Sequence, residues 1–255
     1  MRMGATFALV LILAGPLAAE PPDAARLYAS GQYLAAADAA DDARASADTF
    51  AFAAHALLAA CLIGGAPEQT EDLLERAERR AREAIALDSG AVEARLQLAL
   101  VYGISGRRAS VAEAIARNYA PRGRRLIEQA LALSPEHARA HALLGAWHLE
   151  VLRRGGSAGA LAYGARFAEG VAAFERALEL APDDPMIPLH YSIALLELDA
   201  RVNSARAAEL LALNVALAPR DAFERRGQRI GADLALILAE QGPRAAAMQA
   251  GRLSP

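Results

Sequence analysis

Apolar residues recur along this chain at spacings of three and four, which is the pattern of one face of an α-helix. Short stretches rich in glycine, proline or aspartate separate the apolar runs and mark turns between helices. A single amphipathic helix is expected at 221–240, followed by a frayed tail or a short helix from Gly242 onward. The sequence therefore indicates an all-α fold. Before that last helix, the pattern predicts about five helix pairs, at residues 21–47, 49–87, 91–133, 137–180 and 184–217.

The ends of four predicted helices share a repeated pattern. A leucine stands two residues before each helix stop, and the stops are Ser89, Pro135, Pro182 and Pro219. Small residues let two helices approach closely, and proline ends a helix. The pattern therefore predicts an array of similar helix pairs. Nine residues after each of the first three stops, a large side chain precedes a small one, in the pairs Leu98-Ala99, Leu144-Gly145 and Tyr191-Ser192.

This pattern resembles the tetratricopeptide repeat (TPR), a family of paired helices with a unit of about 34 residues. Leu144 and Gly145 match the first helix of that repeat. Gly170, Phe174 and Pro182 match the second helix. The resemblance implies a TPR-like α-α superhelical array of about five helix pairs with a C-terminal capping helix. A generic alanine-rich helical bundle is the alternative.

The resemblance also implies a concave groove lined by the first helix of each pair. Its lining is mostly apolar, and it lacks the Lys, Arg and Asn set with which chaperone-binding members of the family clamp a peptide carboxylate. The groove is therefore expected to hold a hydrophobic ligand, an amphipathic partner helix or the chain's own inserts folded inward. The family's spacing places these residues in it: Leu96, Leu100, Arg139, Ala142, Ala146, Met186, Leu189 and Ile193.

Two repeat units are longer than the standard unit. The stops at Ser89 and Pro135 lie 46 residues apart, and those at Pro135 and Pro182 lie 47 residues apart. The excess falls between the two helices of a pair, within residues 104–123 and 153–167. Insertions in repeat arrays map to loops on one face, which is often the binding face. Because adjacent units stack in a similar orientation, the two inserts are expected to lie side by side.

Each insert carries a pair of arginines, several small residues and a tyrosine. Guanidinium groups beside aromatic rings suit a carboxylate, a phosphate or an acidic peptide. The alternative is that these arginines solvate helix ends and pair with nearby glutamates. The candidate binding residues in and next to the inserts are Arg107, Arg108, Tyr119, Arg122, Arg124, Arg125, Arg153, Arg154 and Tyr163.

The segment 1–19 has the layout of a secretory signal peptide: an arginine, an apolar run at 5–14 and small residues before an expected cleavage site after Ala19. The apolar run is shorter than the roughly 20 residues of a membrane span, so no integral membrane segment is expected after cleavage. An uncleaved anchor or a buried N-terminal helix is the alternative. The exported chain is expected to be a helical repeat domain at 20–240 with a C-terminal tail at 241–255, in the periplasm of a Gram-negative host.

Three histidines invite a metal-site interpretation. His137 and His141 lie one helical turn apart, and His148 follows them. No cysteine or clustered carboxylate supplies the further ligands that a metal site needs, so these histidines are expected to be structural. Cys61 is the only cysteine, which excludes an internal disulfide and is typical of a small core residue. Trp147 is expected to pack between units or against an insert.

The sequence contains no motif of a nucleophile elbow, a phosphate-binding loop or a dinucleotide-binding turn. The glycine-rich stretch 155–159 follows a predicted helix and is expected to be a flexible loop. Residues 101–170 carry five acidic and ten basic side chains, an excess too small to predict nucleic-acid binding. We therefore expect a non-catalytic protein without a metal, a cofactor or a nucleic-acid partner.

These features predict an exported scaffold or adaptor that binds a protein or peptide partner in the periplasm. The alternative is a protein that binds a small organic anion or a hydrophobic ligand in association with a solute transporter. The resemblance supports this alternative at the level of architecture, because exported TPR proteins include partners of tripartite solute transporters.

Overall fold

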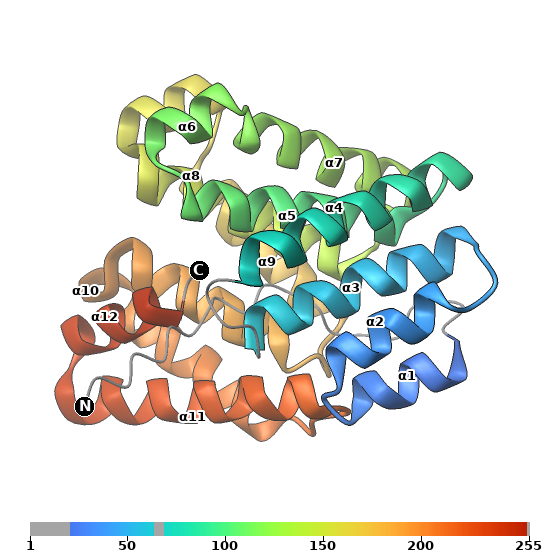
Figure 1. Cartoon of the computed structure of the whole chain (residues 1–255). Helices are drawn as coiled ribbons and strands as arrows, with labels where there is room; N and C mark the ends of the chain where they lie inside the picture. Colours follow the sequence, from blue (N-terminus) through green and yellow to red (C-terminus); the bar gives the residue numbers. More distant parts are fainter. Residues whose placement is uncertain (1–20, 64–68, 254–255) are drawn as a thin grey trace.

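The computed structural model describes residues 21–63 and 69–253, and its regular elements in these ranges are helices without any strand (Figure 1). The predicted all-α fold is therefore confirmed for this part of the chain. The predicted signal peptide at 1–19 lies outside the described residues. In chain order the helices are α1 (Pro22–Ala29), α2 (Tyr33–Asp41), α3 (Ala47–Ile63), α4 (Thr70–Leu87), α5 (Val92–Arg108), α6 (Val111–Ala116), α7 (Tyr119–Leu133), α8 (Ala138–Tyr163), α9 (Phe167–Leu180), α10 (Met186–Ala216), α11 (Ala222–Gln241) and α12 (Pro243–Leu253).

The helices pack as consecutive antiparallel partners. Helix α1 packs on α2, α3 on α4, α5 on α7 and α8 on α9, which matches the first four predicted pairs. The fifth predicted pair, 184–217, is the long helix α10, whose two halves meet at Asp199 with a non-helical backbone (φ −161°, ψ 93°). There the Asp199 carboxylate accepts a hydrogen bond from the Arg201 backbone N–H at 3.0 Å and so caps the second half.

Close contact between α8 and α9 depends on glycine. A methyl group at Gly145 would lie 2.5 Å from Cδ2 of Phe174 and 2.9 Å from the carbonyl oxygen of Gly170. The Phe174 ring is fully buried, and it stacks on Tyr191 of α10 with 4.6 Å between the ring centroids. The small residue on one helix therefore makes room for the large ring on its partner, as the repeat pattern predicts.

Both inserts are helical. The first continues α5 to Arg108, adds the short helix α6 and turns into α7 at Asn118, whose backbone is left-handed (φ 54°). Asparagine adopts this conformation more readily than most residues do. The second insert continues α8 to Tyr163 with one kink at Gly156 (φ 55°). The prediction of a loop at 155–159 is therefore wrong. One glycine with positive φ changes the direction of the helix, and the alanines and the leucine that follow favour its continuation.

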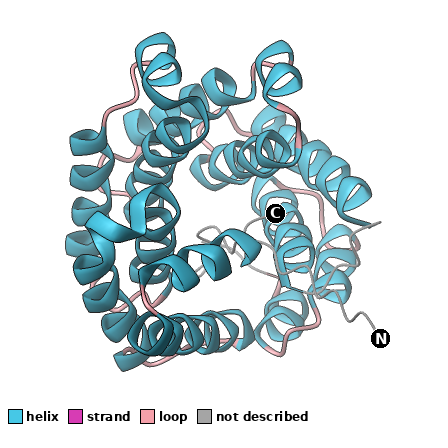
Figure 2. Cartoon of the chain, turned by 90° about the vertical axis from the view of Figure 1, so that its left-hand side faces the viewer, coloured by secondary structure: helices cyan, strands magenta, loops and turns pink. Residues whose placement is uncertain are grey.

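The two ends of the array meet. Helix α11 contacts α1 and α3 as well as α10, and Figure 2 shows the helices arranged around a ring. Phe223 of α11 stacks on Tyr28 of α1 at 6.5 Å between centroids and meets Tyr33 of α2 edge-on at 6.2 Å. The helix predicted as a cap on an open end therefore joins the C-terminal part of the chain to its N-terminal part.

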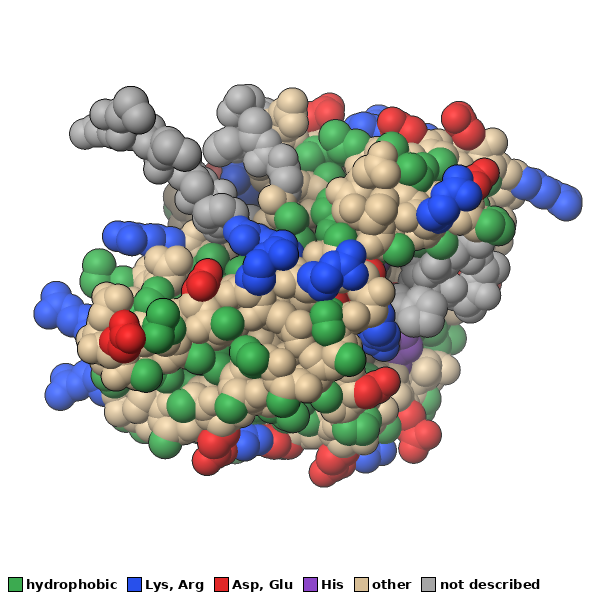
Figure 3. All heavy atoms as spheres, turned by 90° about the horizontal axis from the view of Figure 1, so that it is seen from below, with side chains coloured by type: hydrophobic (Ala, Val, Ile, Leu, Met, Phe, Trp, Pro, Cys, Tyr) green, Lys and Arg blue, Asp and Glu red, His purple; other side chains and the backbone are tan. Residues whose placement is uncertain are grey.

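The predicted C-terminal tail contains a helix, which was one of the two alternatives for this segment. Helix α12 buries Ala246, Ala250 and Leu253, and it packs on α10 and α11. Among the described residues, none of the helices combines the length and the apolar character that a membrane span requires. On the face seen from below, arginine, acidic and apolar side chains are interspersed (Figure 3).

We expect the substitution Gly145→Ala to lower the free energy of unfolding by about 1–3 kcal/mol, because the added methyl group overlaps the Phe174 ring and the Gly170 backbone. Urea unfolding followed by circular dichroism measures this loss. Gly103→Ala is the matched control: Gly103 also lies inside a helix, and a methyl group there has no heavy atom within 4 Å. The control should be neutral or up to about 1 kcal/mol more stable. Equal stabilities would contradict the close-approach role of Gly145.

A cavity between the two inserts

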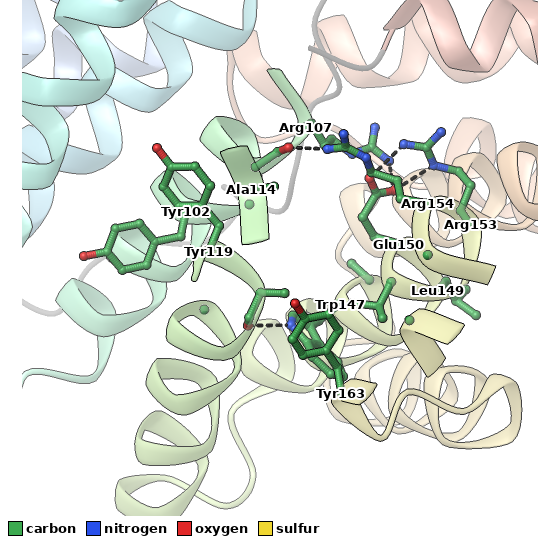
Figure 4. A pocket seen from close by; sticks show the side chains of 18 of the residues that line it. Tyr102, Arg107, Ala114, Tyr119, Trp147, Leu149, Glu150, Arg153, Arg154 and Tyr163 are labelled. Carbon is green, nitrogen blue, oxygen red and sulfur yellow. Dashed lines mark hydrogen bonds and ion pairs between the residues drawn. The ribbon is translucent and has the colours of Figure 1, made fainter. Parts of the chain in front are cut away.

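A cavity of about 480 Å³ lies between the two inserts (Figure 4). Residues of α5, α6 and α7 form one side, residues of α8 form the other, and α10 contributes part of the wall. The inserts therefore lie side by side around a common space, as expected from the stacking of adjacent units. The volume falls within the range of about 300–1,000 Å³ that is usual for small-molecule sites.

Most of the cavity wall is apolar or aromatic. The Trp147 ring is held on this wall because its Nε1–H donates a hydrogen bond to the Ala120 carbonyl at 2.8 Å. Behind it, the Arg124 guanidinium lies 4.9 Å from the Trp147 ring and donates to the Tyr163 carbonyl at 2.9 Å. These contacts fix the aromatic part of the cavity between the two inserts. The large apolar and aromatic residues of the wall are Leu100, Tyr102, Val111, Ile115, Tyr119, Ile127, Leu143, Trp147, Leu149, Val151, Tyr163 and Ile193.

One end of the cavity carries a buried ionic cluster. Arg107 of α5 donates through Nη2 to Glu150 of α8 and, at 2.9 Å, to Glu197 of α10. Arg153 also bonds Glu150, at 2.8 Å. The side chains of Arg107 and Glu197 are 7% and 4% exposed, so this bridge between three helices is largely shielded from water. Burial raises the pKa of Glu150, but the hydrogen bond from Arg153 and the charge of Arg107 outweigh it and lower the pKa.

Arg154 joins the second insert to the end of α5. Its guanidinium donates to the carbonyls of Gly106 and Ala109, the latter at 2.9 Å. Both carbonyls belong to the last turn and the cap of α5, where backbone acceptors have no partner within the helix. A cation is also favoured at this negative end of the helix dipole. Arg154 of α8 therefore supplies hydrogen bonds to carbonyl groups at the C-terminus of α5.

The structure divides the arginines and tyrosines predicted for the site into two groups. Neither Arg108 nor Arg125 lines the cavity, and both are exposed. Arg122 lies behind the wall, with its guanidinium 3.9 Å from the centroid of the Tyr102 ring. Arg124 also lies behind it, on Trp147, and pairs with Glu128 at 2.7 Å. The predicted residues that do line the cavity are Arg107, Tyr119, Arg153, Arg154 and Tyr163.

The residues predicted for the concave groove do not form an open surface. Leu100, Ala146 and Ile193 line the insert cavity. The other five are buried in the structure, because the inward sides of the first helices pack against each other and against α11 in the closed ring. These five are Leu96, Arg139, Ala142, Met186 and Leu189.

The three histidines have separate partners. His137 bonds Glu93 at 2.9 Å, His141 bonds the Pro135 carbonyl at 2.7 Å, and the ring of His148 accepts from the Arg166 backbone N–H at 3.1 Å. Nowhere in the described ranges do three or more histidine, cysteine or acidic side chains gather as they would to hold a metal ion.

The other predictions about single residues concern the core. Cys61 is buried, and burial raises the pKa of its thiol to about 11. Trp147 packs against the first insert, as its bond to Ala120 shows.

Sequence reasoning missed both glutamates of the ionic cluster. Glu150 has a local signal, since it stands three residues before Arg153 and can pair with it on one helix face. Glu197 has no local signal in the sequence, because it lies 90 residues from its partner Arg107. His190, which also lines the cavity, gave no signal beyond the apolar helix around it.

Comparisons of this chain with protein-family models, with curated proteins and with solved structures gave no match. We therefore infer the function from the cavity itself. Its geometry offers continuous apolar contact along most of the wall and charged groups at one end.

We expect Arg107→Met to lower the free energy of unfolding by about 3–5 kcal/mol, because it leaves Glu197 in a buried position without the charge of Arg107. Thermal and urea unfolding measure the loss. The neighbouring Arg108→Met is the matched control, since Arg108 is exposed at the same helix end, and its effect should stay within about 0.5 kcal/mol. Similar losses in both variants would show that the bridge to Glu150 and Glu197 does not hold the helices together.

Proposed function

We propose that this chain is a non-catalytic binding protein that holds a small, largely apolar ligand in the cavity between its two inserts. One observation carries the proposal: a space of about 480 Å³ with a mainly apolar and aromatic wall and a few charged groups at one end. Small-molecule sites have this size and this division between apolar contact and orienting polar groups.

The size of the cavity argues against a packing defect. Protein interiors rarely contain voids much larger than a water molecule. The wall of this space includes exposed residues such as Val111, Ile115 and Ala158, so it is a pocket open to solvent and not a sealed void in the core. Here the two inserts, which depart from the regular repeat length, are the segments that surround the space. The added residues therefore form about half of the wall, and the repeat helices form the rest, which supports a binding role for the inserts.

The protonation states in the cavity support binding over catalysis. Glu150 has a lowered pKa and is engaged by two arginines, so it is a weak proton acceptor near neutral pH. Arg153 is occupied by Glu150, and Arg154 is occupied by backbone carbonyls. These charged groups are therefore suited to holding a geometry and orienting a bound molecule.

The scaffold around the cavity is, in our proposal, a TPR-like array that is exported to the periplasm through the signal segment 1–19. The consecutive helix pairs and the contact of Gly145 with Phe174 support the TPR-like part. The sequence pattern of 1–19 supports the export. A protein or peptide partner in the concave groove has less support, because most residues predicted for that groove are buried.

The single tryptophan of the chain gives a direct test, because Trp147 lines the cavity. A neutral apolar dye such as N-phenylnaphthylamine should bind and accept excitation energy from Trp147. We expect Ala114→Phe to weaken dye binding about tenfold or more, because Ala114 of α6 lines the cavity and the added ring occupies the space.

Ala112→Phe is the matched control for that test. Ala112 lies on the same short helix as Ala114, is exposed and does not line the cavity. Its dye affinity should stay within about twofold of the wild-type value. Equal binding by the wild type and by both variants would show that the dye binds elsewhere and would contradict the proposed function.

A further inference from the structure

The polarity of the cavity changes from one end to the other. In Figure 4, Arg107, Glu150, Arg153 and Arg154 gather at one end, and Trp147 lies away from them with the aromatic part of the wall. A molecule that fills the whole space must therefore place a polar group at the arginine end and an apolar body along the rest.

The charges at that end leave an excess of one positive charge. Arg107, Arg153 and Arg154 contribute three positive charges, and Glu150 and Glu197 contribute two negative charges. The wall also contains His190, whose pKa burial lowers to about 3, so that its ring is neutral. A ligand with one negative charge would bring this set of charges to neutrality, whereas a cationic ligand would increase its excess positive charge.

Arg107 also has an N–H donor that makes no hydrogen bond within the described part of the chain. Its Nη2 serves both Glu150 and Glu197, but its Nη1 is buried and has no hydrogen-bond partner among the described residues. A buried donor without an acceptor is unfavourable, and an arginine can bond a carboxylate through two parallel N–H groups. Arg107 is itself among the residues that line the cavity.

We propose that the ligand of this cavity is an apolar molecule with a single carboxylate, bound with the carboxylate at Arg107 and the apolar body along Trp147 and Tyr163. This inference rests on the proposed function of the cavity as a ligand site. It adds the charge, the orientation and the chemical class of the ligand: a monocarboxylic acid with a chain or ring system of medium size.

A competition experiment compares three ligands that share one apolar tail and differ in the charge of the head group: negative, neutral or positive. The protein is loaded with N-phenylnaphthylamine, and decanoate, decanol or decyltrimethylammonium is added while energy transfer from Trp147 is followed. We expect decanoate to displace the dye at a concentration about tenfold lower than decanol, and the ammonium compound to be the weakest competitor.

The outcomes distinguish this inference from the proposed function beneath it. Equal displacement by decanoate and decanol would overturn the carboxylate inference and leave an apolar ligand site. Stronger displacement by the ammonium compound would also overturn it. A protein that binds neither the dye nor any of the three compounds, with unchanged Trp147 fluorescence, would overturn both.

Two variants test the role of the charges. Glu197→Gln keeps the shape of the side chain and raises the excess charge at this end to two, so decanoate should bind about threefold or more tightly while decanol is unchanged. The double substitution Arg107→Met with Glu197→Met keeps the excess charge at one but removes the Arg107 donor. It should weaken decanoate about tenfold and leave decanol near its wild-type affinity, which also shows that the variant is folded.

Arg108→Met serves as the control for general charge effects, because Arg108 carries the same charge at the same helix end but is exposed outside the cavity. Its decanoate affinity should match that of the wild type. An equal loss in this control and in the double variant would show that decanoate binding does not depend on the Arg107 donor in particular, and would overturn its assigned role.

Discussion

The buried bridge from Arg107 to Glu150 and Glu197 is the contact on which the insert region depends. Ion pairs taken out of water contribute less net stability than their short distances suggest, because desolvation offsets much of the attraction. Their geometry is nevertheless strict, so the end of α5 is fixed relative to α8 and α10. The cavity lies beside this bridge, because Arg107, Glu150 and Glu197 all belong to its wall.

The features that the sequence predicted correctly are those with a local physical cause. Apolar periodicity predicted the helices, and the repeated leucine before each stop predicted where several of them end. Gly145 and Phe174 were each matched to a position of the repeat pattern, and the structure places them in contact. The composition of the second insert led to a wrong prediction of its backbone conformation. The glycines at 155–159 predicted a loop, but only Gly156 has a non-helical backbone, and the helix continues after it.

The rest depends on contacts between distant segments, which no local pattern encodes. Arg107 was predicted as a binding residue, but its pairing with Glu197 spans 90 residues and turns it into a structural group as well. The groove residues were predicted to line a concave surface that holds a ligand, a partner helix or the chain's own inserts, because an open array leaves its inner face accessible. The contact of Phe223 with Tyr28 closes the ring, and Met186 and Leu189 are buried where they meet Gly227 of α11. The cavity is the part of the inner space that the two inserts keep open.

The closure of the ring has a consequence for how the molecule folds and opens. In an open repeat array each unit contacts only its neighbours, so the terminal units fray first and folding can spread from any point. Here Arg225 of α11 bonds the Ala29 carbonyl of α1 across 196 residues. Closing a loop of this length has a large entropic cost, so we expect the contact to form after the intervening helices are in place. Once formed, it ties both ends together, and their slowest amide hydrogens should exchange with solvent only through global unfolding.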